Sequence, residues 1–222
     1  MQFVYHENAG ETLLHVELRA YEHLFKVRRL GVGDMSTWRT LGDAWLHTYS
    51  VESIGKKEAM LRLEKSEELS CVPLKNVHLA WCVIDPKIIE KTLPMLNELG
   101  VSSISFVYAD FSQKNHKLDY ERMRRIVINS CQQCGRTKKM VLEEFSSVKA
   151  YLEAYPKTRV IDFCETPLSP DGSEGSYIIG PEGGFSTQER QLLKNCSVVG
   201  FTCNAILRSE TAVVSVAAKI LA

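Results

Sequence analysis

The chain has 222 residues, of which 45% are hydrophobic and 24% charged, and its 27 basic and 27 acidic residues cancel to a formal net charge of zero. A chain of this length buries a substantial core in one large or two modest domains. No stretch reaches the roughly 18 uninterrupted apolar residues of a membrane span. The N-terminal MQFVYHENAG also lacks the basic-then-apolar pattern of a secretory signal. We therefore expect a cytoplasmic protein with no membrane partner.

The seven cysteines are an odd number at irregular spacing, in a chain too large to need stapling, so we expect free thiols rather than a disulfide framework. Cys131 and Cys134 have the CxxC spacing of a metal or redox pair. No second pair or histidine cluster follows at zinc-finger distance, and the surrounding pattern is helical. The pattern favours structural thiols, and no metal site is predicted.

Positive charge is concentrated in three segments, KVRR at 26–29, RMRR at 122–125 and GRTKK at 135–139. Such local patches can hold phosphates while the whole protein stays neutral. Solvated helix faces and turns explain each segment equally well. Residues 1–69 contain nine Lys and Arg against eleven Asp and Glu, so any basic surface there must be local.

Residues 1–69 contain short apolar segments separated by turns such as GVGD and GKKE, a pattern that predicts a small β-rich domain. One short helix is expected within AYEHLFKVRR, where Tyr21, Leu24 and Phe25 share a face. Pro73 then blocks continuation of any helix in the connecting stretch.

From residue 74 the pattern changes to alternating strand and helix signals. Strands are predicted at 77–84, 102–109, 159–165, 176–180 and 197–202, and helices at 86–100, 118–135, 146–155, 186–195 and 209–222. This alternation predicts an α/β fold with a mainly parallel, twisted sheet and helices on both faces. In that architecture ligands collect at the carboxyl ends of the strands.

One such end is the segment SYIIGPEGGFSTQER at 176–190. Pro181 fixes one φ angle, while Gly180, Gly183 and Gly184 permit positive φ and leave no Cβ, so backbone can approach a ligand closely.

Ser186 and Glu189 have the spacing of a capping box, which predicts that a helix starts directly after this turn. Two kinds of site fit: a phosphate cradle, or a pocket in which main-chain groups read an adenine and ribose. A plain glycine-rich connection is the third interpretation. A phosphate loop of the GxxxxGK[ST] type would need a lysine that is absent here.

A second loop lies in CNAILRSETAVVSVAAK at 203–219. Ser209 is a candidate helix cap, and Glu210 in the first turn favours the helix dipole. Arg208 has no such structural explanation, and an arginine before a helix of small apolar residues is well placed to hold a planar or anionic group.

The ordered pair IIGPEGGFSTQE and ILRSETA resembles the C-terminal motifs of the RsmE family, SPOUT-class methyltransferases that modify N3 of a uridine in 16S ribosomal RNA. EHLFKVRRLGVGD resembles the family's PUA-like RNA-binding segment. PKIIEKTLPMLNELGV is similar to its first methyltransferase-domain helix, and RMRRIVINSCQQCGR to its arginine-bearing helix. The resemblance covers nearly the whole chain.

The resemblance implies an N-terminal PUA-like β-barrel domain at 1–69 and a SPOUT methyltransferase domain at 70–222, whose threaded loops form a trefoil knot. Nothing in the periodicity predicts such a knot. It further implies S-adenosylmethionine as cofactor, 16S rRNA or the small ribosomal subunit as partner, and a homodimer.

It also implies roles for individual residues. The cofactor-binding residues would be Gly180, Glu182, Gly183, Gly184, Ile206, Leu207 and Ala212. The RNA-binding residues would be Arg28, Arg29, Arg122, Arg125 and Arg136. Arg208 is our candidate catalytic residue, because its guanidinium can stabilise the uracil anion, and Glu210 could orient Arg208 or accept a proton.

The chain departs from the family pattern at two places. The segment before ILR, Thr202 to Ala205, lacks a Leu-Gly and a further arginine, and YADFSQKN at 108–115 replaces a Ser-Glu-Arg-Ser stretch. Three alternatives stay open: a related SPOUT enzyme acting on ribose 2′-OH or another base, a catalytically silent RNA-binding or ribosome-assembly factor, and a phosphate-binding α/β enzyme. The sequence does not give the target uridine or a catalytic base.

Overall fold

The computed structural model describes residues 2–112, 117–169, 175–202 and 205–222. It divides into two compact units, the first comprising Met1–Val72 with Ile128–Lys139 and the second comprising Pro73–Val127 with Met140–Ala222. Within the described ranges, the helices are too short or too polar to cross a membrane.

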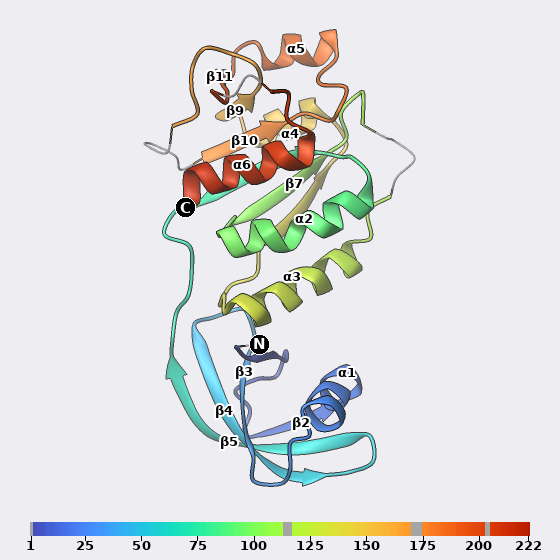
Figure 1. Cartoon of the computed structure of the whole chain (residues 1–222), viewed down its shortest axis with the longest axis vertical. Coiled ribbons are helices and arrows are strands. Elements are labelled where there is room, and N and C mark those ends of the chain that lie inside the picture. Colours follow the sequence, from blue (N-terminus) through green and yellow to red (C-terminus); the bar gives the residue numbers. More distant parts are fainter. Residues whose placement is uncertain (1, 113–116, 170–174, 203–204) are drawn as a thin grey trace. The chain divides into compact units, whose positions relative to one another are not determined.

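The first unit is built on a five-stranded sheet in the order β1-β3-β4-β5-β2 (Figure 1). Its strands are β1 (Val4–Tyr5), β2 (Leu13–Glu17), β3 (Met35–Arg39), β4 (Trp45–Ile54) and β5 (Glu58–Glu68). All neighbours are antiparallel except β1 and β3. The sheet curls into a half-barrel around a core that includes Trp38, Tyr49 and Leu61, which confirms the predicted β-rich, barrel-like unit.

The helix predicted near residue 21 forms as a short α1 (Leu18–Tyr21) that runs into η1 (Glu22–Val27), a π-helix. Tyr21, Leu24 and Phe25 are buried, as their shared face predicted. Their burial closes one side of the half-barrel core.

The second unit contains a six-stranded, wholly parallel sheet in the order β11-β9-β10-β6-β7-β8, which confirms the predicted parallel sheet. Its strands are β6 (Val77–Cys82), β7 (Ser103–Val107), β8 (Val141–Phe145), β9 (Thr158–Ile161), β10 (Gly175–Ile179) and β11 (Ser197–Val199).

Strand β8 was not predicted, because Glu143 and Glu144 interrupt its apolar pattern. The strand forms at the edge of the sheet through pairing with β7. The Glu143 carboxylate accepts hydrogen bonds from Ser105 and Tyr155, at 3.0 and 2.8 Å, so the fold itself supplies partners for this acidic group.

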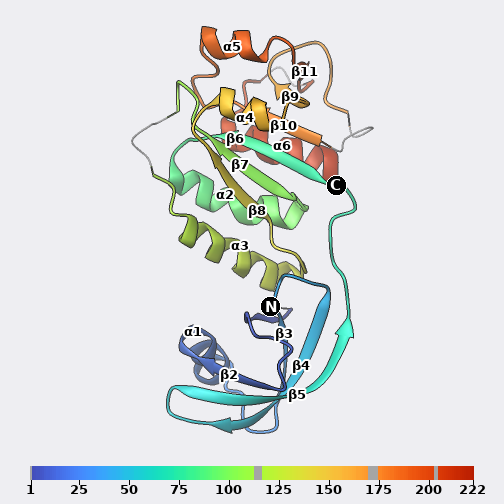
Figure 2. The ribbon, with the colours of Figure 1, turned by 180° about the vertical axis from the view of Figure 1, so that it is seen from behind.

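Helices cover both faces of the sheet. The helices of this unit are α2 (Pro86–Leu99), α4 (Val148–Ala154), α5 (Thr187–Leu193) and α6 (Ser209–Leu221). Helix α3 (Tyr120–Cys134) begins in this unit, and its residues from Ile128 on belong to the first unit. Figure 1 shows α2 and α6 in front of the sheet, and the reverse view in Figure 2 shows α4 on the other face. The predicted ends of α2 are confirmed: Asp85 caps its start by accepting from the Lys87 N–H, and Gly100 ends it at φ 100°.

Candidate active site

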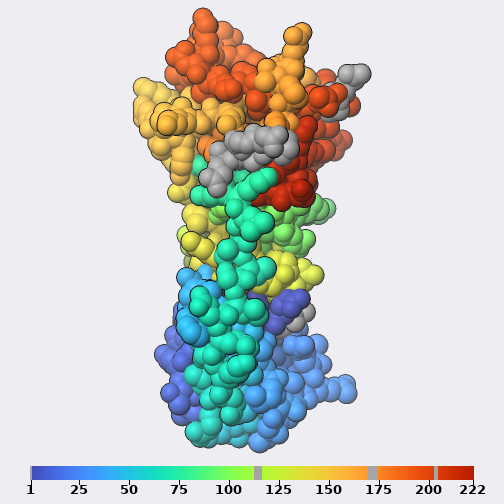
Figure 3. All heavy atoms as spheres, turned by 90° about the vertical axis from the view of Figure 1, so that its left-hand side faces the viewer, coloured from blue at the N-terminus to red at the C-terminus, as the bar shows by residue number. Residues whose placement is uncertain are grey.

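The second unit has a cavity of about 840 Å³ at the carboxyl ends of β9 and β10. Three segments line it: the chain after β9, the turn after β10, and the segment leading into α6. In the space-filling view the orange segments of this unit lie against the red C-terminal segment (Figure 3). The volume falls within the range of about 300–1,000 Å³ that holds small organic ligands.

The glycines of the turn after β10 serve different purposes. Gly184 has φ +70°, which favours glycine, whereas Gly180 and Gly183 do not adopt positive φ. A Cβ on Gly180 would lie 3.3 Å from the Phe185 ring, and one on Gly183 would lie 3.1 Å from Cβ of Phe111. The predicted freedom in φ is thus needed at one glycine, and the other two are needed for space.

The predicted capping box is confirmed: the Ser186 hydroxyl accepts from the Glu189 N–H at 3.2 Å, and the Glu189 carboxylate accepts from the Ser186 N–H at 2.9 Å. The buried Glu189 also accepts from the Asp110 N–H at 2.8 Å, and the Ser186 hydroxyl donates to the Asp110 carboxylate at 2.5 Å. These bonds join the turn after β10 to the chain that follows β7.

The expectation that Ser209 caps α6 is wrong. Arg208 occupies the N-cap position without a side-chain cap, so Ser209 lies one residue inside the helix. The Ser209 hydroxyl instead donates to the Gly180 carbonyl at 2.8 Å and accepts from the Trp81 indole N–H at 2.9 Å. Ser209 therefore connects the two loops that the sequence singled out.

Most of the predicted cofactor residues come together in the structure. The cavity is lined by Gly180, Glu182, Gly184, Ile206, Leu207 and Ala212, together with Arg208. Gly183 does not line it and faces Phe111. The segment Thr202–Ala205 departs from the family pattern, and its end residues Thr202 and Ala205 line the cavity. Its central residues Cys203 and Asn204 lie outside the described residues.

Sequence reasoning missed the wall that follows β9. This wall comprises Ile161, Asp162, Phe163, Cys164, Glu165 and Pro167. The available signal was that the predicted strand at 159–165 ends at the same sheet edge as the strand before the glycine turn, because parallel strands place their carboxyl ends together.

The cavity combines apolar surface with acidic groups. Ile179, Leu207 and Ala212 supply apolar lining, and Glu165 and Glu182 are exposed carboxylates. The carboxylate of Asp162 is paired with the Arg190 guanidinium at 2.9 Å, and Arg190 also donates to the Phe185 carbonyl. The lining therefore suits a ligand with a flat apolar part, hydroxyls and a positive charge.

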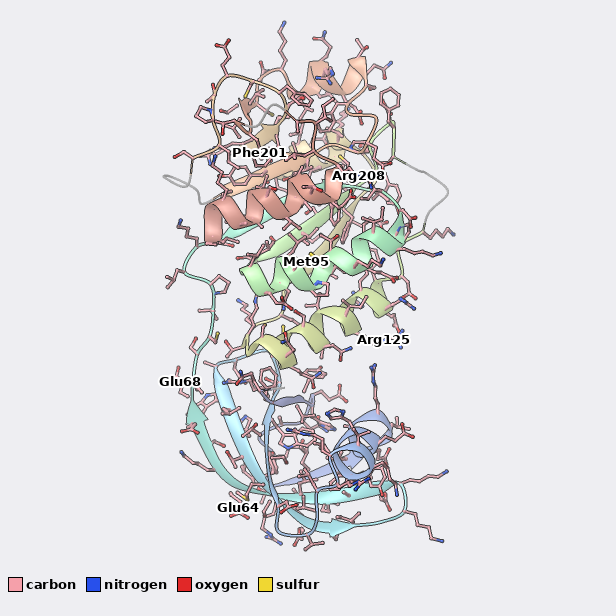
Figure 4. All side chains as sticks on the ribbon, in the orientation of Figure 1. Glu64, Glu68, Met95, Arg125, Phe201 and Arg208 are labelled. Carbon is pink, nitrogen blue, oxygen red and sulfur yellow. The ribbon has the colours of Figure 1, made fainter. Side chains whose placement is uncertain are left out.

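Arg208 lies at the amino end of α6, with its side chain 82% exposed and its Nη1 atom 4.0 Å from Oε1 of Glu210 (Figure 4). The Glu210 side chain is 22% exposed. Within the described residues, its buried Oε2 atom has no hydrogen-bond partner. Arg208 thus presents a cation at the cavity, whereas Glu210 does not line the cavity and keeps a buried carboxylate oxygen with free acceptor capacity.

The arginines predicted to contact RNA occupy different environments. Arg28 and Arg29 are exposed after η1 in the first unit. Arg122 and Arg125 are exposed on α3, where Arg122 pairs with Glu90 at 2.8 Å.

Arg136 is buried, and its Nε donates to the Lys138 carbonyl at 2.8 Å. The buried Arg136 therefore helps to hold the turn at 136–138. Its position in a basic cluster of the sequence did not predict this role.

The described cysteines are free, and Cys203 lies outside the described residues. Cys131 is buried and Cys134 half-buried at the end of α3. Among the described side chains, the metal-compatible cluster is the exposed group His15, Glu17 and Glu58, which belongs to the first unit.

Residues 71–221 match the family model described as RNA methyltransferase domain. The match spans nearly all of the second unit, including the parallel sheet and the whole cavity wall. Fold and site thus define the chain as a member of the RNA methyltransferase class.

Relatives identify the family within that class. The chain is 47% identical over 222 residues to ribosomal RNA small subunit methyltransferase E of Helicobacter pylori J99, covering 98% of each chain. It is 26% identical over 227 residues to the protein of the same name from Aquifex aeolicus, covering 97% of each. The chain belongs to the ribosomal RNA small subunit methyltransferase E family, as its motifs predicted.

Solved structures agree with this fold. A Legionella pneumophila protein in complex with the bound cofactor SAM superposes with a TM-score of 0.81 at 25% identity, covering 97% of this chain and 96% of that one. Ribosomal RNA small subunit methyltransferase E from Neisseria gonorrhoeae, bound to S-adenosyl methionine, superposes with a TM-score of 0.80 at 21% identity, covering 98% and 95%.

Proposed function

We propose that this protein transfers a methyl group from S-adenosylmethionine to N3 of a uridine in the 16S RNA of the small ribosomal subunit. The observation that carries the proposal is the cavity in the second unit, built from the two family motifs, with Arg208 at its edge. Membership of a family whose relatives are named small-subunit rRNA methyltransferases supports the substrate class.

The cavity fits this cofactor. Gly180 and Gly184 line it without side chains, so main-chain groups of the turn can approach a ligand closely. Leu207 and Ala212 would hold the adenine, and the exposed Glu182 would hold ribose hydroxyls or the ammonium of the methionine part. When bound, the cofactor supplies an electrophilic methyl group on a sulfonium.

The protein must make uracil N3 nucleophilic, because the neutral imide nitrogen is a poor nucleophile. Methyl transfer forms the N3–C bond, breaks the S–C bond and leaves a neutral thioether, and the N3 proton departs. The negative charge of the uracil anion spreads onto its two carbonyl oxygens. A fixed cation beside one of these oxygens therefore lowers the barrier.

Arg208 would supply that cation. Its guanidinium is exposed at the cavity, and its contact with Glu210 is long, at 4.0 Å, so its donors stay available to a carbonyl oxygen. Glu210 would hold the guanidinium near the amino end of α6 by charge attraction across that distance. Glu210 does not line the cavity, so its side chain would have to turn toward the substrate for its unpartnered Oε2 to accept the N3 proton.

The RNA would be held by both units. We propose that residues 1–69 form a PUA-like RNA-binding domain and residues 70–222 a knotted SPOUT domain. We also propose that the protein is a cytoplasmic homodimer. Size-exclusion chromatography with light scattering would test the dimer. Arg28, Arg29, Arg122 and Arg125 are exposed and suited to phosphate contacts that fix the register of the RNA. The buried Arg136 would support RNA binding indirectly, by holding the turn at 136–138.

The direct test uses purified protein, radiolabelled S-adenosylmethionine and undermethylated small ribosomal subunits, followed by digestion and identification of the labelled nucleoside. We expect label in 3-methyluridine. Label in another nucleoside would show that the enzyme methylates a different position from the one proposed. Cofactor binding without any label would favour a silent RNA-binding or assembly factor.

The role of Arg208 has a separate test. Arg208→Ala should lower the rate of methyl transfer by well over tenfold and change cofactor affinity by only a few fold, because the contact strengthens as the anion develops. Lys219→Ala, an exposed cation at the other end of α6, is the matched control. Equal losses of rate and affinity in Arg208→Ala would make Arg208 a cofactor-binding residue instead.

A further inference from the structure

A second hollow, of about 370 Å³, lies in the first unit between β1, the loop after η1, and strands β3 and β4. Strand β1 pairs with β3 only at Trp38 and Arg39, so within the described residues that ladder stops short of Met35 to Thr37. The hollow opens at this uncovered edge of β3. Its volume lies at the small end of the range for ligand pockets, which suits a single nucleotide.

The side chains of the hollow offer both hydrogen-bond acceptors and donors. The Thr37 hydroxyl donates its only hydrogen to the Gln2 carbonyl at 3.0 Å, so it can only accept from a ligand. The Ser36 hydroxyl accepts from the Trp38 indole N–H at 2.8 Å, so its own hydrogen is available to donate. Met35 adds a polarisable apolar surface and is 52% exposed. An unpaired base presents a matching combination of flat face, donors and acceptors.

Positive charge borders the same hollow. Arg28 lines it and is exposed. Among the ion pairs of the described residues, none involves Lys26, Arg28 or Arg29. These cations therefore remain available for phosphate, which a charge already paired with a carboxylate would not be.

The cations on β5, next to β4, already have acidic partners. Arg62 and Lys65 pair there with Glu52 and Glu67. Glu64 and Glu68, labelled on β5 in Figure 4, add further negative charge. Because Arg62 and Lys65 are already neutralised in pairs, the cations of the segment at 26–29 are better placed to attract a polyanion.

The backbone fixes Arg28 in this place. The η1 π-helix ends where the Arg28 N–H bonds to the His23 carbonyl at 2.9 Å, and Leu30 then bonds back to Leu24 at 3.1 Å. Between them Arg29 adopts φ 59°, a left-handed conformation that is unfavourable for a residue with a Cβ. Such strain persists where the surroundings over-determine the backbone, and it clusters at functional sites, as π-helical turns do.

Resting on the proposed function, which makes RNA the substrate, we propose that this hollow binds one unpaired nucleotide of that RNA. Its base packs on Met35 and donates to the Thr37 hydroxyl, and its phosphate pairs with Arg28. The hollow then selects single-stranded RNA, because a base inside a duplex cannot enter it.

The test measures binding of the full-length protein to a short fluorescein-labelled single-stranded RNA and to the same RNA annealed to its complement. No cofactor is added. Arg28→Ala should weaken single-strand binding on the order of tenfold and lower the salt slope by about one. Thr37→Val, which keeps shape and removes the hydroxyl, should weaken single-strand binding alone. Lys65→Ala, an exposed cation of the same unit, should leave both affinities unchanged.

Equal affinities of wild type, Arg28→Ala and Thr37→Val would overturn the proposal. A loss in Arg28→Ala that is the same for duplex and single strand would overturn the nucleotide site and leave a general phosphate contact. NMR titration with the single-stranded RNA gives an independent readout, with shifts expected at the Met35 and Thr37 methyl groups. Because binding needs no methyl transfer, the hollow and the proposed reaction can fail separately.

Discussion

Replacing Ser209 with alanine should lower the free energy of unfolding of the second unit by about 2–4 kcal/mol. The Ser209 hydroxyl bonds to the Trp81 indole N–H at 2.9 Å and to the Gly180 carbonyl at 2.8 Å, and Trp81 is fully buried. An orphaned buried donor or acceptor costs about 1–3 kcal/mol, and the half-buried Gly180 can partly recover its bond from water. No capping energy is lost, because Arg208 is the N-cap.

Urea unfolding followed by circular dichroism measures this change. Ser215→Ala is the control, since Ser215 lies on the same helix without a side-chain hydrogen bond that ties two loops. That variant should be unchanged or slightly more stable, because alanine is the better helix former. A loss below about 0.5 kcal/mol in Ser209→Ala would refute the reasoning, since exposed substitutions cost that little.

Three further predictions concern backbone space, pH and thiol access. Gly200→Ala should prevent stable folding of the second unit, because the new Cβ would lie 2.7 Å from the Asp162 carbonyl oxygen; soluble protein with wild-type melting behaviour would contradict this. Burial lowers the pKa of His78 below its ordinary value. As the pH falls through about 6.5, His78 therefore becomes protonated in the unfolded chain before it does so in the folded protein, and the folded state loses stability. His78→Gln should flatten this loss between pH 7.5 and about 5.5 in urea titrations; an unchanged slope would exclude it. Iodoacetamide should alkylate the exposed Cys164 and spare Cys82, whose pKa is raised by burial, and S-adenosylhomocysteine should protect Cys164. Equal alkylation rates with and without that ligand, read by mass spectrometry, would place the cofactor elsewhere.

Local sequence signals predicted the elements of the second unit well. The ends of α2 were visible in Pro86 and Gly100, and the start of α5 in the Ser186 and Glu189 capping box. These signals succeed because caps and turns depend on residues only a few positions apart. Strand β8 was not predicted, because the hydrogen bonds that stabilise Glu143 come from Ser105 and Tyr155, which lie elsewhere in the chain.

The candidate site was likewise predicted only in part. Its two loops could be found from the glycines, Arg208 and the family resemblance. The sequence did not predict that the segment after β9 forms a wall of the cavity, or that Gly183 faces Phe111 instead of the cavity. Both depend on which strand ends meet and how side chains pack.

The sequence by itself determined the α/β class, the family and the two loops, because periodicity, capping residues and motif order are local properties of the chain. Only the tertiary structure decided that Ser209 bonds to Trp81 and Gly180, that Arg136 is buried, and that Arg28 borders a hollow. Such facts depend on contacts between residues far apart in the chain, whose partners are fixed only when the sheet and its helices pack together.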